Sequence, residues 1–496
     1  MRSGSSEEPV IEVKELSVKY HSRDHYAVRD ISFSIRKGSF VWLAGNSASG
    51  KSTVMNALCG FIPHIIPADV EGTMIFDGKE NLNSYELARN ICMVHQDPEA
   101  QFCTERVEDE IAFGLENYKT PRKKINRKID EVLKLLNCSA LRHRKLHNLS
   151  GGEKQKIAIA SMLVLDPEVL ILDEPTSNLD AISMGEVLSA IKSIKKDNPE
   201  LSIILAEHRI GGLMDHVDSM IKLDEGDIVE DIPDFQGVKE EKKKELADYS
   251  YPDFQRKKTR KSEPIVQIKG LTYKAGGKKI LDSISTNIKQ GEIVALMGRN
   301  GSGKTTLINH ISGLIDIQQG KIKVFDEMMS RRKKSSPWEI GEKMGYVFQN
   351  PNHQIFENTV EDEMLFGPKN FSKGVTEARK KTVEITKKEN IEKETHPHTL
   401  SFGQKRRLNV HSSSGHDPDL LIIDEPFSGQ DHSNALAIAS ILDRHWKNGI
   451  TLIIVTHNLE FAKKFCTRTM VLKGGKMVYD GAPEDLKDIE GDTKDA

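Results

Sequence analysis

The chain has 496 residues, with 71 Lys or Arg against 74 Asp or Glu and a formal net charge of −3. At roughly 100–200 residues per domain, this length predicts roughly two to four domains. The near balance of charge gives no support for nucleic acid or an anionic membrane as a partner. The five cysteines form no pair at metal-ligand or redox spacing, which favours reduced thiols in a cytosolic protein.

The N-terminal sequence, MRSGSSEEPV, has no apolar run of the kind found in signal peptides. No stretch of about 18 consecutive apolar residues follows it. We therefore expect a soluble chain with a flexible N-terminus over residues 1–9. A first folded domain is expected over residues 10–234, where short β-rich apolar runs alternate with helical patterns.

The first chemical motif is a glycine-rich loop, GNSASGKS, which follows the apolar run FVWLA. It fits the pattern G-x-x-x-x-G-K-[ST] between a strand and a helix, where backbone N–H groups approach phosphates and the helix N-terminus favours negative charge. We call such a loop a phosphate cradle; its Lys51 should reach the β- and γ-phosphate oxygens, and its Ser52 should bind Mg²⁺. The predicted nucleotide-binding residues here are Gly45, Asn46, Ser47, Ser49, Gly50, Lys51, Ser52 and Thr53.

A second motif, the apolar run EVLILDEP, ends in the acidic pair Asp173 and Glu174. This run and SIILAEH are apolar throughout rather than alternating, which is typical of strands buried on both faces of a mostly parallel sheet. The fold class is therefore predicted as α/β. An acid at a strand end can hold the Mg²⁺ shell, and its neighbour can accept a proton from the attacking water. Alone, such a pair would be a turn in most proteins, but after a phosphate cradle it indicates catalysis.

The whole pattern then repeats. Gly45 and Gly298 are 253 residues apart, and Ser150 and Ser401 are 251 apart, so a complete domain is duplicated. The second copy is expected over 264–486, before a flexible C-terminus at 487–496. Between the copies, residues 235–263 are charge-rich without an apolar period, which predicts a solvated linker. The second copy provides the cradle residues Gly298, Asn300, Gly301, Gly303, Lys304, Thr305 and Thr306, and the acidic pair Asp424 and Glu425.

The sequence LSGGEKQKIAIA at 149–160 resembles the signature of ABC-type ATPases, and the resemblance spans nearly the whole chain. It implies two tandem P-loop domains that use ATP and Mg²⁺, each with a mostly parallel sheet, flanking helices and a helical signature subdomain. In that family two such domains pack head to tail, and each ATP lies between the cradle of one and the signature of the other. The resemblance therefore implies that the two domains pair within this one chain.

Site residues follow from the resemblance. One site would join Lys51, Ser52, Gln96, Asp173, Glu174 and His208 to Ser401, Gly403 and Gln404. The other would join Lys304, Thr305, Gln349, Asp424, Glu425 and His457 to Ser150, Gly151, Gly152 and Glu153. The two glutamates resemble catalytic bases, the glutamines resemble loop residues that sense Mg²⁺ and the membrane partner, and the histidines resemble the γ-phosphate switch. The implied Mg²⁺ ligands are Ser52, Gln96, Asp173, Thr305, Gln349 and Asp424.

The two copies differ at a few positions. The second signature, LSFGQKRRLNV, has Phe402 where the family usually has glycine, so a bulky residue stands where backbone should approach phosphate. The helix behind it continues as HSSSGH, where the first copy has the apolar SMLVL. Tyr20 matches the family's adenine-stacking aromatic residue, whereas the aligned residue in the second copy is Ala275; Tyr273, on the same strand face, is the candidate substitute. We expect two ATP sites, with the one that uses Phe402 being the slower.

The sequence VFQNPNHQIFENTVEDEMLFG and its counterpart in the first copy resemble the region after the loop glutamine in energy-coupling-factor (ECF) transporter ATPases, which import vitamins and cobalt or nickel ions. This implies integral membrane partners, which supply energy coupling and substrate binding, and a peripheral place on the cytoplasmic face of the membrane. Two alternatives remain: a tandem sugar-importer ATPase, and a soluble ATPase that acts on ribosomes or nucleic acid. The linker of roughly thirty residues, without heptads or Cys pairs, argues against the latter.

Overall fold

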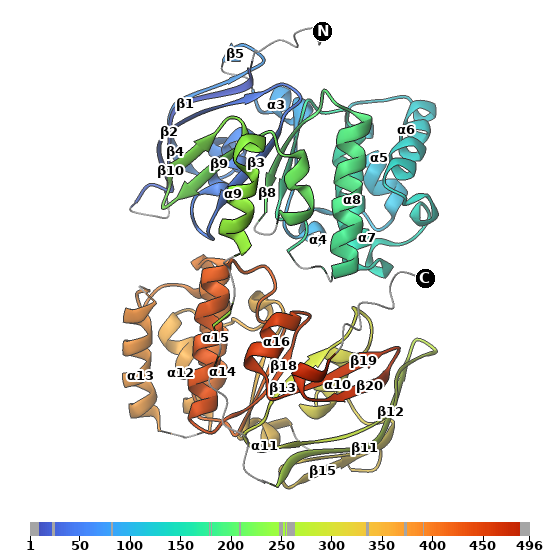
Figure 1. Cartoon of the computed structure of the whole chain (residues 1–496), viewed down its shortest axis with the longest axis vertical. Coiled ribbons are helices and arrows are strands. Elements are labelled where there is room, and N and C mark those ends of the chain that lie inside the picture. The colour runs from blue at the N-terminus through green and yellow to red at the C-terminus, as the bar shows by residue number, and fades with distance from the viewer. Residues whose placement is uncertain are drawn as a thin grey trace. The chain divides into compact units, whose positions relative to one another are not determined.

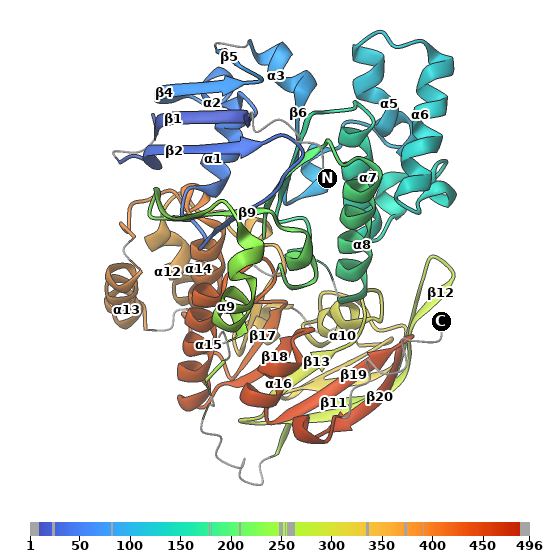
Figure 2. The same ribbon diagram turned by 45° about the horizontal axis from the view of Figure 1, so that its top comes forward.

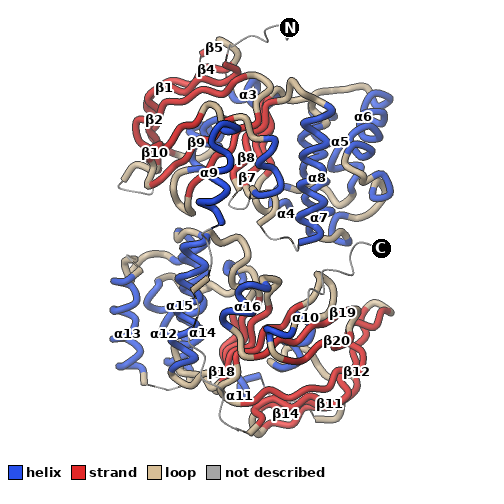
Figure 3. Tube along the Cα trace, in the orientation of Figure 1, coloured by secondary structure: helices blue, strands red, loops and turns tan. Residues whose placement is uncertain are grey.

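The computed structural model divides the chain into two compact units, 1–249 and 250–496 (Figure 1). It describes residues 9–21, 25–80, 83–177, 179, 181–207, 210–247, 251–252, 254, 263–333, 337–371, 374–389 and 391–486. Each unit combines strands and helices, which Figure 3 separates by colour. The predicted α/β class is confirmed.

A six-stranded sheet forms the centre of the first unit, in the order β10-β9-β3-β8-β7-β6. All neighbouring strands are parallel except the β9–β10 pair. The middle strands β3, β8 and β7 are almost entirely buried, as their continuous apolar sequences predict. The strands are β3 (Phe40–Gly45), β6 (Ile91–Val94), β7 (Val169–Asp173), β8 (Ser202–Ala206), β9 (Ser219–Asp224) and β10 (Asp227–Ile232).

An antiparallel sheet, ordered β2-β1-β4-β5, is the second layer of this unit, and its strands β2, β1 and β4 lie side by side in Figure 2. Helices α5, α6 and α7 group on the opposite side of the unit in Figure 1. The strands are β1 (Pro9–Tyr20), β2 (Val28–Arg36), β4 (Ala68–Phe76) and β5 (Lys79–Glu80). The helices are α1 (Lys51–Leu58), α2 (Phe61–His64), α3 (Ser84–Asn90), α4 (Pro98–Gln101), α5 (Val107–Asn117), α6 (Arg122–Leu135), α7 (Gly151–Leu163) and α8 (Ala181–Asp197).

The second unit repeats this plan, with sheets ordered β16-β17-β18-β13-β19-β20 and β12-β11-β14-β15. Its strands are β11 (Pro264–Ala275), β12 (Lys278–Lys289), β13 (Ile293–Met297), β14 (Gln319–Val324), β15 (Glu327–Ser330), β16 (Met344–Val347), β17 (Leu420–Asp424), β18 (Thr451–Val455), β19 (Arg468–Lys473) and β20 (Lys476–Gly481). Its helices are α10 (Lys304–Ile311), α11 (Pro337–Gly341), α12 (Val360–Asn370), α13 (Val375–Lys388), α14 (Phe402–Ser414), α15 (His432–Lys447) and α16 (Leu459–Phe465).

The stretch predicted as a solvated linker is structured at its start. Residues 235–247 form helix α9 (Phe235–Ala247), whose first side chain is fully buried and packs edge-on against Trp42, with 5.8 Å between ring centroids. At the other end, Tyr251 is buried among aromatic residues of the second unit. Each of these contacts depends on a single aromatic residue among charged residues, so the sequence of the segment shows no apolar periodicity. Most of the remaining stretch, including 255–262, lies outside the described residues.

Within the described ranges, no helix is both long and apolar enough to cross a bilayer. All five cysteines are free thiols in the structure, and only Cys103 is exposed.

Candidate active sites

Backbone geometry forms the two phosphate cradles. In the first, β3 ends at Gly45, whose φ is +142°, and a Cβ atom there would lie 2.4 Å from the carbonyl oxygen of Leu223. Gly298 has the same conformation, and a Cβ atom there would lie 2.3 Å from the carbonyl oxygen of Leu472. Only glycine fits at these positions. Each loop then turns into the N-terminus of a helix, α1 or α10, where unpaired backbone N–H groups favour anions.

Each cradle has side chains suited to phosphate. The Lys51 ammonium donates hydrogen bonds to the carbonyl oxygens of Gly45 (2.9 Å) and Asn46 (2.7 Å), and Lys304 does the same toward Gly298 (2.7 Å). The buried hydroxyls of Ser49 and Ser302 have no hydrogen-bond partner among the described residues. Buried polar atoms without partners are uncommon. The cradle residues therefore fit a bound triphosphate, which these donors would hold.

Oxygen ligands for Mg²⁺ converge beside each cradle. The hydroxyl of Ser52 lies 3.5 Å from the Asp173 carboxylate, and that of Thr305 lies 3.0 Å from the Asp424 carboxylate. Hydroxyl and carboxylate oxygens are the ligands that Mg²⁺ prefers, so these residues fit the ion. When bound, Mg²⁺ neutralises charge that develops on the transferred phosphoryl group.

The pKa values of both strand-end aspartates are raised. Burial raises the pKa of Asp173 to about 7, and the neighbouring Glu174 carboxylate adds to this rise, while Lys51 and Ser52 oppose it. Burial likewise raises the pKa of Asp424 to about 6, against the hydrogen bond from Thr305. The charged form of both carboxyl groups is therefore disfavoured unless a cation is bound beside them.

The two glutamates occupy matching strained turns. Glu174 and Glu425 have φ values of +43° and +47°, a left-handed backbone conformation that residues other than glycine rarely adopt. The backbone N–H of Glu174 donates to the carbonyl of Ala206 (2.8 Å), and that of Glu425 donates to Val455 (3.0 Å). These bonds fix each turn against the neighbouring strand and place both acidic residues at the carboxyl end of the sheet.

The described side-chain contacts of these glutamates include a glutamine in the first unit and a histidine in the second. The Gln96 side chain donates to the Glu174 carboxylate at 2.9 Å. In the second unit, Gln349 is exposed and its side chain makes no hydrogen bond within the described structure. Instead, Nδ1 of His457 lies 3.0 Å from the Glu425 carboxylate. His208, the predicted counterpart of His457, lies outside the described residues.

The predicted signature residues begin helices α7 and α14. Ser150 and Ser401 are N-caps in matching capping boxes, in which the side chains of Glu153 and Gln404 accept from the backbone N–H of the capping serine. A Cβ atom on Gly152 would lie 2.8 Å from Ser183, and one on Gly403 would lie 2.8 Å from Asn434. The last glycine of each signature is therefore required for close packing onto the next helix.

Phe402 leaves this geometry intact. Its counterpart Gly151 has no positive φ, and a Cβ atom there would meet only Leu179, at 3.2 Å. In the second unit the Phe402 ring lies over the guanidinium of Arg406. The structure therefore gives a physical reason why a large side chain is accepted at this position and not at Gly403.

The two tyrosines considered for adenine binding have different surroundings. The Tyr20 hydroxyl lies 3.0 Å from that of Thr53 at the start of α1, so its ring lies beside the cradle helix. The Tyr273 ring packs edge-on against buried His310, with 4.8 Å between centroids. Tyr273 is thus engaged in a contact with α10, and the adenine role of both tyrosines stays a prediction.

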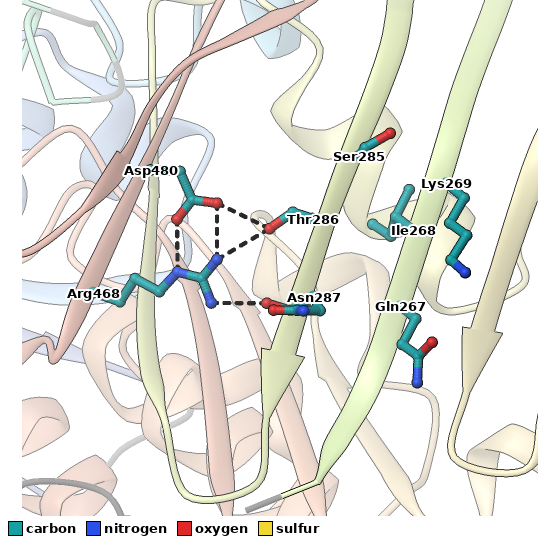
Figure 4. A pocket seen from close by; sticks show the side chains of 8 residues that line it. All are labelled: Gln267, Ile268, Lys269, Ser285, Thr286, Asn287, Arg468 and Asp480. Atoms are coloured by element: carbon teal, nitrogen blue, oxygen red, sulfur yellow. Dashed lines mark hydrogen bonds and ion pairs between the residues drawn. The ribbon is translucent and has the colours of Figure 1, made fainter. Parts of the chain in front are cut away.

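A separate hollow of about 400 Å³ on the second unit contains an ion pair (Figure 4). Arg468 donates to both carboxylate oxygens of Asp480, at 2.6 and 2.8 Å, and to the carbonyl oxygen of Asn287 at 2.7 Å. These bonds fasten β19 and β20 to the antiparallel sheet. Because its guanidinium is engaged in this way, we assign Arg468 a structural role.

The sequence predictions missed three residues that contact the loop around Gln349. Arg406, Asn409 and Ser413 of α14 donate hydrogen bonds to backbone carbonyls of that segment. Their sequence signal was present, because the polar stretch that includes HSSSGH replaces apolar residues of the first copy.

Comparison with known proteins gives consistent matches. The family described as ABC transporter matches residues 28–177 and 281–428. A "Putative ABC transporter ATP-binding protein" of Methanosarcina mazei is 35% identical over 487 residues, 95% of each chain. The "Putative HMP/thiamine import ATP-binding protein YkoD" of Bacillus subtilis is 32% identical over 512 residues, covering 96% of this chain and 92% of that protein.

Among solved structures, cbiO1 from Clostridium perfringens, part of the ABC transporter complex cbiONQ, is 30% identical with a TM-score of 0.43. The match covers 48% of this chain and 92% of that chain. The family match falls on both units and includes both cradles and both acidic pairs. The chain belongs to the ABC transporter family, as an ATPase coupled to transport with two ATP-binding domains in tandem.

Proposed function

We propose that the chain is the ATP-hydrolysing subunit of an ECF-type importer, which takes up a vitamin or metal ion through separate membrane subunits. The resemblance of the segments after Gln96 and Gln349 to ECF ATPases supports this, as does the import function in the name of the Bacillus subtilis relative. We also propose that the chain is peripheral, on the cytoplasmic face of the membrane.

One observation carries the proposal of a protein partner. Phe356 and Phe366, which follow the Gln349 loop, are 58% and 43% exposed, and their rings pack edge-on with 4.6 Å between centroids. Phe348, in the same segment, is 38% exposed. Neighbouring aromatic side chains that remain in solvent indicate a surface that another protein covers. Phe113, the counterpart of Phe366, is 42% exposed in the first unit.

We further propose that ATP and Mg²⁺ bind at two sites, with the predicted residues in the roles assigned above. Glu174 and Glu425 act as general bases, Asp173 and Asp424 hold Mg²⁺ with Ser52 and Thr305, and the signature of each domain completes the site of the other. The matching geometry of the cradles, acidic pairs and capping boxes supports equivalent chemistry in both copies.

The test is co-purification from detergent-solubilised membranes of the native organism, with the bound proteins identified by mass spectrometry. The proposal predicts an energy-coupling membrane protein together with a small integral substrate-binding protein. Recovery of ribosomal proteins or nucleic acid would instead favour a soluble ATPase, and recovery of sugar-permease subunits would favour a sugar importer.

A further inference from the structure

We propose that Arg406, Asn409 and Ser413 are positioning residues, which fasten the Gln349 loop of the second unit to its signature helix. The inference rests on the proposed role of Gln349 at the nucleotide site. It concerns a difference between the two copies that is set by α14 itself.

Three donors on one face of α14 reach the loop. Arg406 donates to the carbonyl of Phe348 (2.8 Å), Asn409 to that of Pro351 (3.0 Å), and Ser413 to that of Tyr346 (2.8 Å). Their spacing of three and four residues places them on one side of a helix. The anchored carbonyls lie on both sides of Gln349, so the backbone that carries this glutamine is held before and after it.

Burial makes these bonds costly to break. Arg406 and Asn409 are fully buried, and Ser413 is 9% exposed. Nε of Arg406 and Oδ1 of Asn409 already have no partner among the described residues. In that part of the chain Arg406 also makes no ion pair. If the loop left α14, these side chains would lose the hydrogen bonds that offset their burial.

The Phe402 ring completes the arrangement by covering the Arg406 guanidinium, 5.6 Å from its centroid. Residues four apart on a helix face each other, so the two side chains form a pair. Gly151 and Gln155 occupy these positions in the first copy. Phe402 therefore acts inside its own helical subdomain, on the residue that holds the loop.

The first unit does not have this connection. Its corresponding residues are Gln155, Ala158 and Met162, of which alanine and methionine have no side-chain donor. Nε2 of Gln155 has no partner within the described ranges. Two kinds of anchor are common to both copies. One is a glutamine, Gln101 or Gln354, whose side chain bonds to the backbone of its own segment. The other is an exposed lysine of the signature helix that bonds to the loop, Lys154 to Glu99 or Lys405 to Asn352.

The difference parallels the position of the loop glutamine. Gln96, on the loop without these anchors, reaches Glu174, whereas Gln349, on the anchored loop, points into solvent. In our proposal, the approach of Gln349 to Glu425 breaks the buried hydrogen bonds between the loop and α14. We infer that Mg·ATP binding to the second unit includes the free-energy cost of releasing the loop from α14. Binding to the first unit has no such cost.

The first test is hydrogen exchange in the nucleotide-free full chain, which does not depend on transport or hydrolysis. Ser413→Ala and Arg406→Gln should speed the exchange of backbone amides between residues 348 and 354 roughly tenfold. Ser412→Ala is the matched control, because this neighbouring buried hydroxyl donates only to Asn409 O within the helix. Equal exchange in Ser412→Ala and Ser413→Ala would overturn the proposal.

The second test asks whether the residues act through Gln349. Arg406→Gln should lower the KM for Mg·ATP roughly threefold or more, with a smaller change in kcat, because less of the binding energy is spent on releasing the loop. In a Gln349→Ala background the same substitution should leave KM unchanged. A KM effect that persists without Gln349 would overturn the proposal, and would assign the effect of Arg406 to packing or to its electrostatic interaction with Asp424 and Glu425. Absence of any ATPase activity in the wild-type chain would instead contradict the proposed function.

Discussion

The ring of Phe402 lies 5.6 Å from the guanidinium carbon of Arg406, one turn further along α14. The guanidinium is fully buried without a carboxylate at ion-pair distance in the described structure, so the aromatic face adds to the longer-range attraction of Asp424 and Glu425. The two side chains should therefore be energetically coupled. An alignment of the two signatures gives no sign of this coupling, because it shows only two separate residue differences.

A double-mutant cycle tests this coupling. Phe402→Leu and Arg406→Gln, singly and together, should give an interaction free energy of about 0.5–2 kcal/mol. Urea unfolding followed by tryptophan fluorescence in a Trp42→Phe background reports the second unit alone, because the other two tryptophans, Trp338 and Trp446, lie there. Strict additivity would mean that the ring and the guanidinium are neighbours without mutual stabilisation.

Hydrolysis should depend on the two glutamates at the strained turns. Glu174→Gln combined with Glu425→Gln keeps the shape of both side chains but removes both general bases, so the steady-state ATPase rate should fall by ~10²–10⁴. Binding of a fluorescent ATP analogue should be retained, which separates lost chemistry from lost folding. Unchanged turnover in the double variant would remove these residues from the mechanism.

Much of this site follows from sequence because its parts are local. A strand, a glycine-rich loop and a helix are consecutive in the chain, so the geometry around Gly45 and Lys51 is encoded within about ten residues. The repeat then assigns the same parts to the second copy. The acidic pairs are likewise fixed by the strands that precede them.

The contacts of the loop glutamines could not be predicted in this way. The sequences HQDP and FQNP look equivalent, yet Gln96 and Gln349 have different surroundings. The second loop is held by side chains of α14 that lie 58 to 67 residues beyond the carbonyl groups they bond. Burial of Arg406 depends on how α14 packs, and arginine is usually exposed. Helix α9 was missed for a similar reason, since one buried phenylalanine anchors an otherwise charged segment.

The raised pKa of Asp173 predicts a pH-dependent stability of the nucleotide-free chain. Its carboxyl group titrates near 7 in the folded unit and near 4 when unfolded, so the native state holds the proton more tightly. The stability that this provides is present at acidic pH and is lost as the pH rises through about 7. Asp173→Asn removes the penalty of the buried anion. The substitution should therefore raise the melting temperature of the first unit at pH 8, by roughly 4 °C, and much less at pH 5.

Calorimetry without Mg²⁺ or nucleotide provides this measurement. Adding Mg²⁺ at pH 8 should stabilise the wild-type first unit more than the Asp173→Asn unit, because the carboxylate ligand is missing in the variant. An equal shift of melting temperature at pH 5 and pH 8 would show that the effect of the substitution is not electrostatic.

The exposed aromatic pair of the second unit should be required for attachment to the membrane partner. Phe356→Ser combined with Phe366→Ser removes two neighbouring rings, and truncating aromatic anchors at an interface commonly costs more than 1 kcal/mol each. Recovery of the membrane subunits by affinity purification should fall roughly tenfold or more, while ATP binding persists. Val229→Ser is a suitable control, since Val229 is 55% exposed on β10 of the other unit. If both variants recover the membrane subunits as well as the wild-type chain does, the partner docks elsewhere and the aromatic pair has no role in assembly.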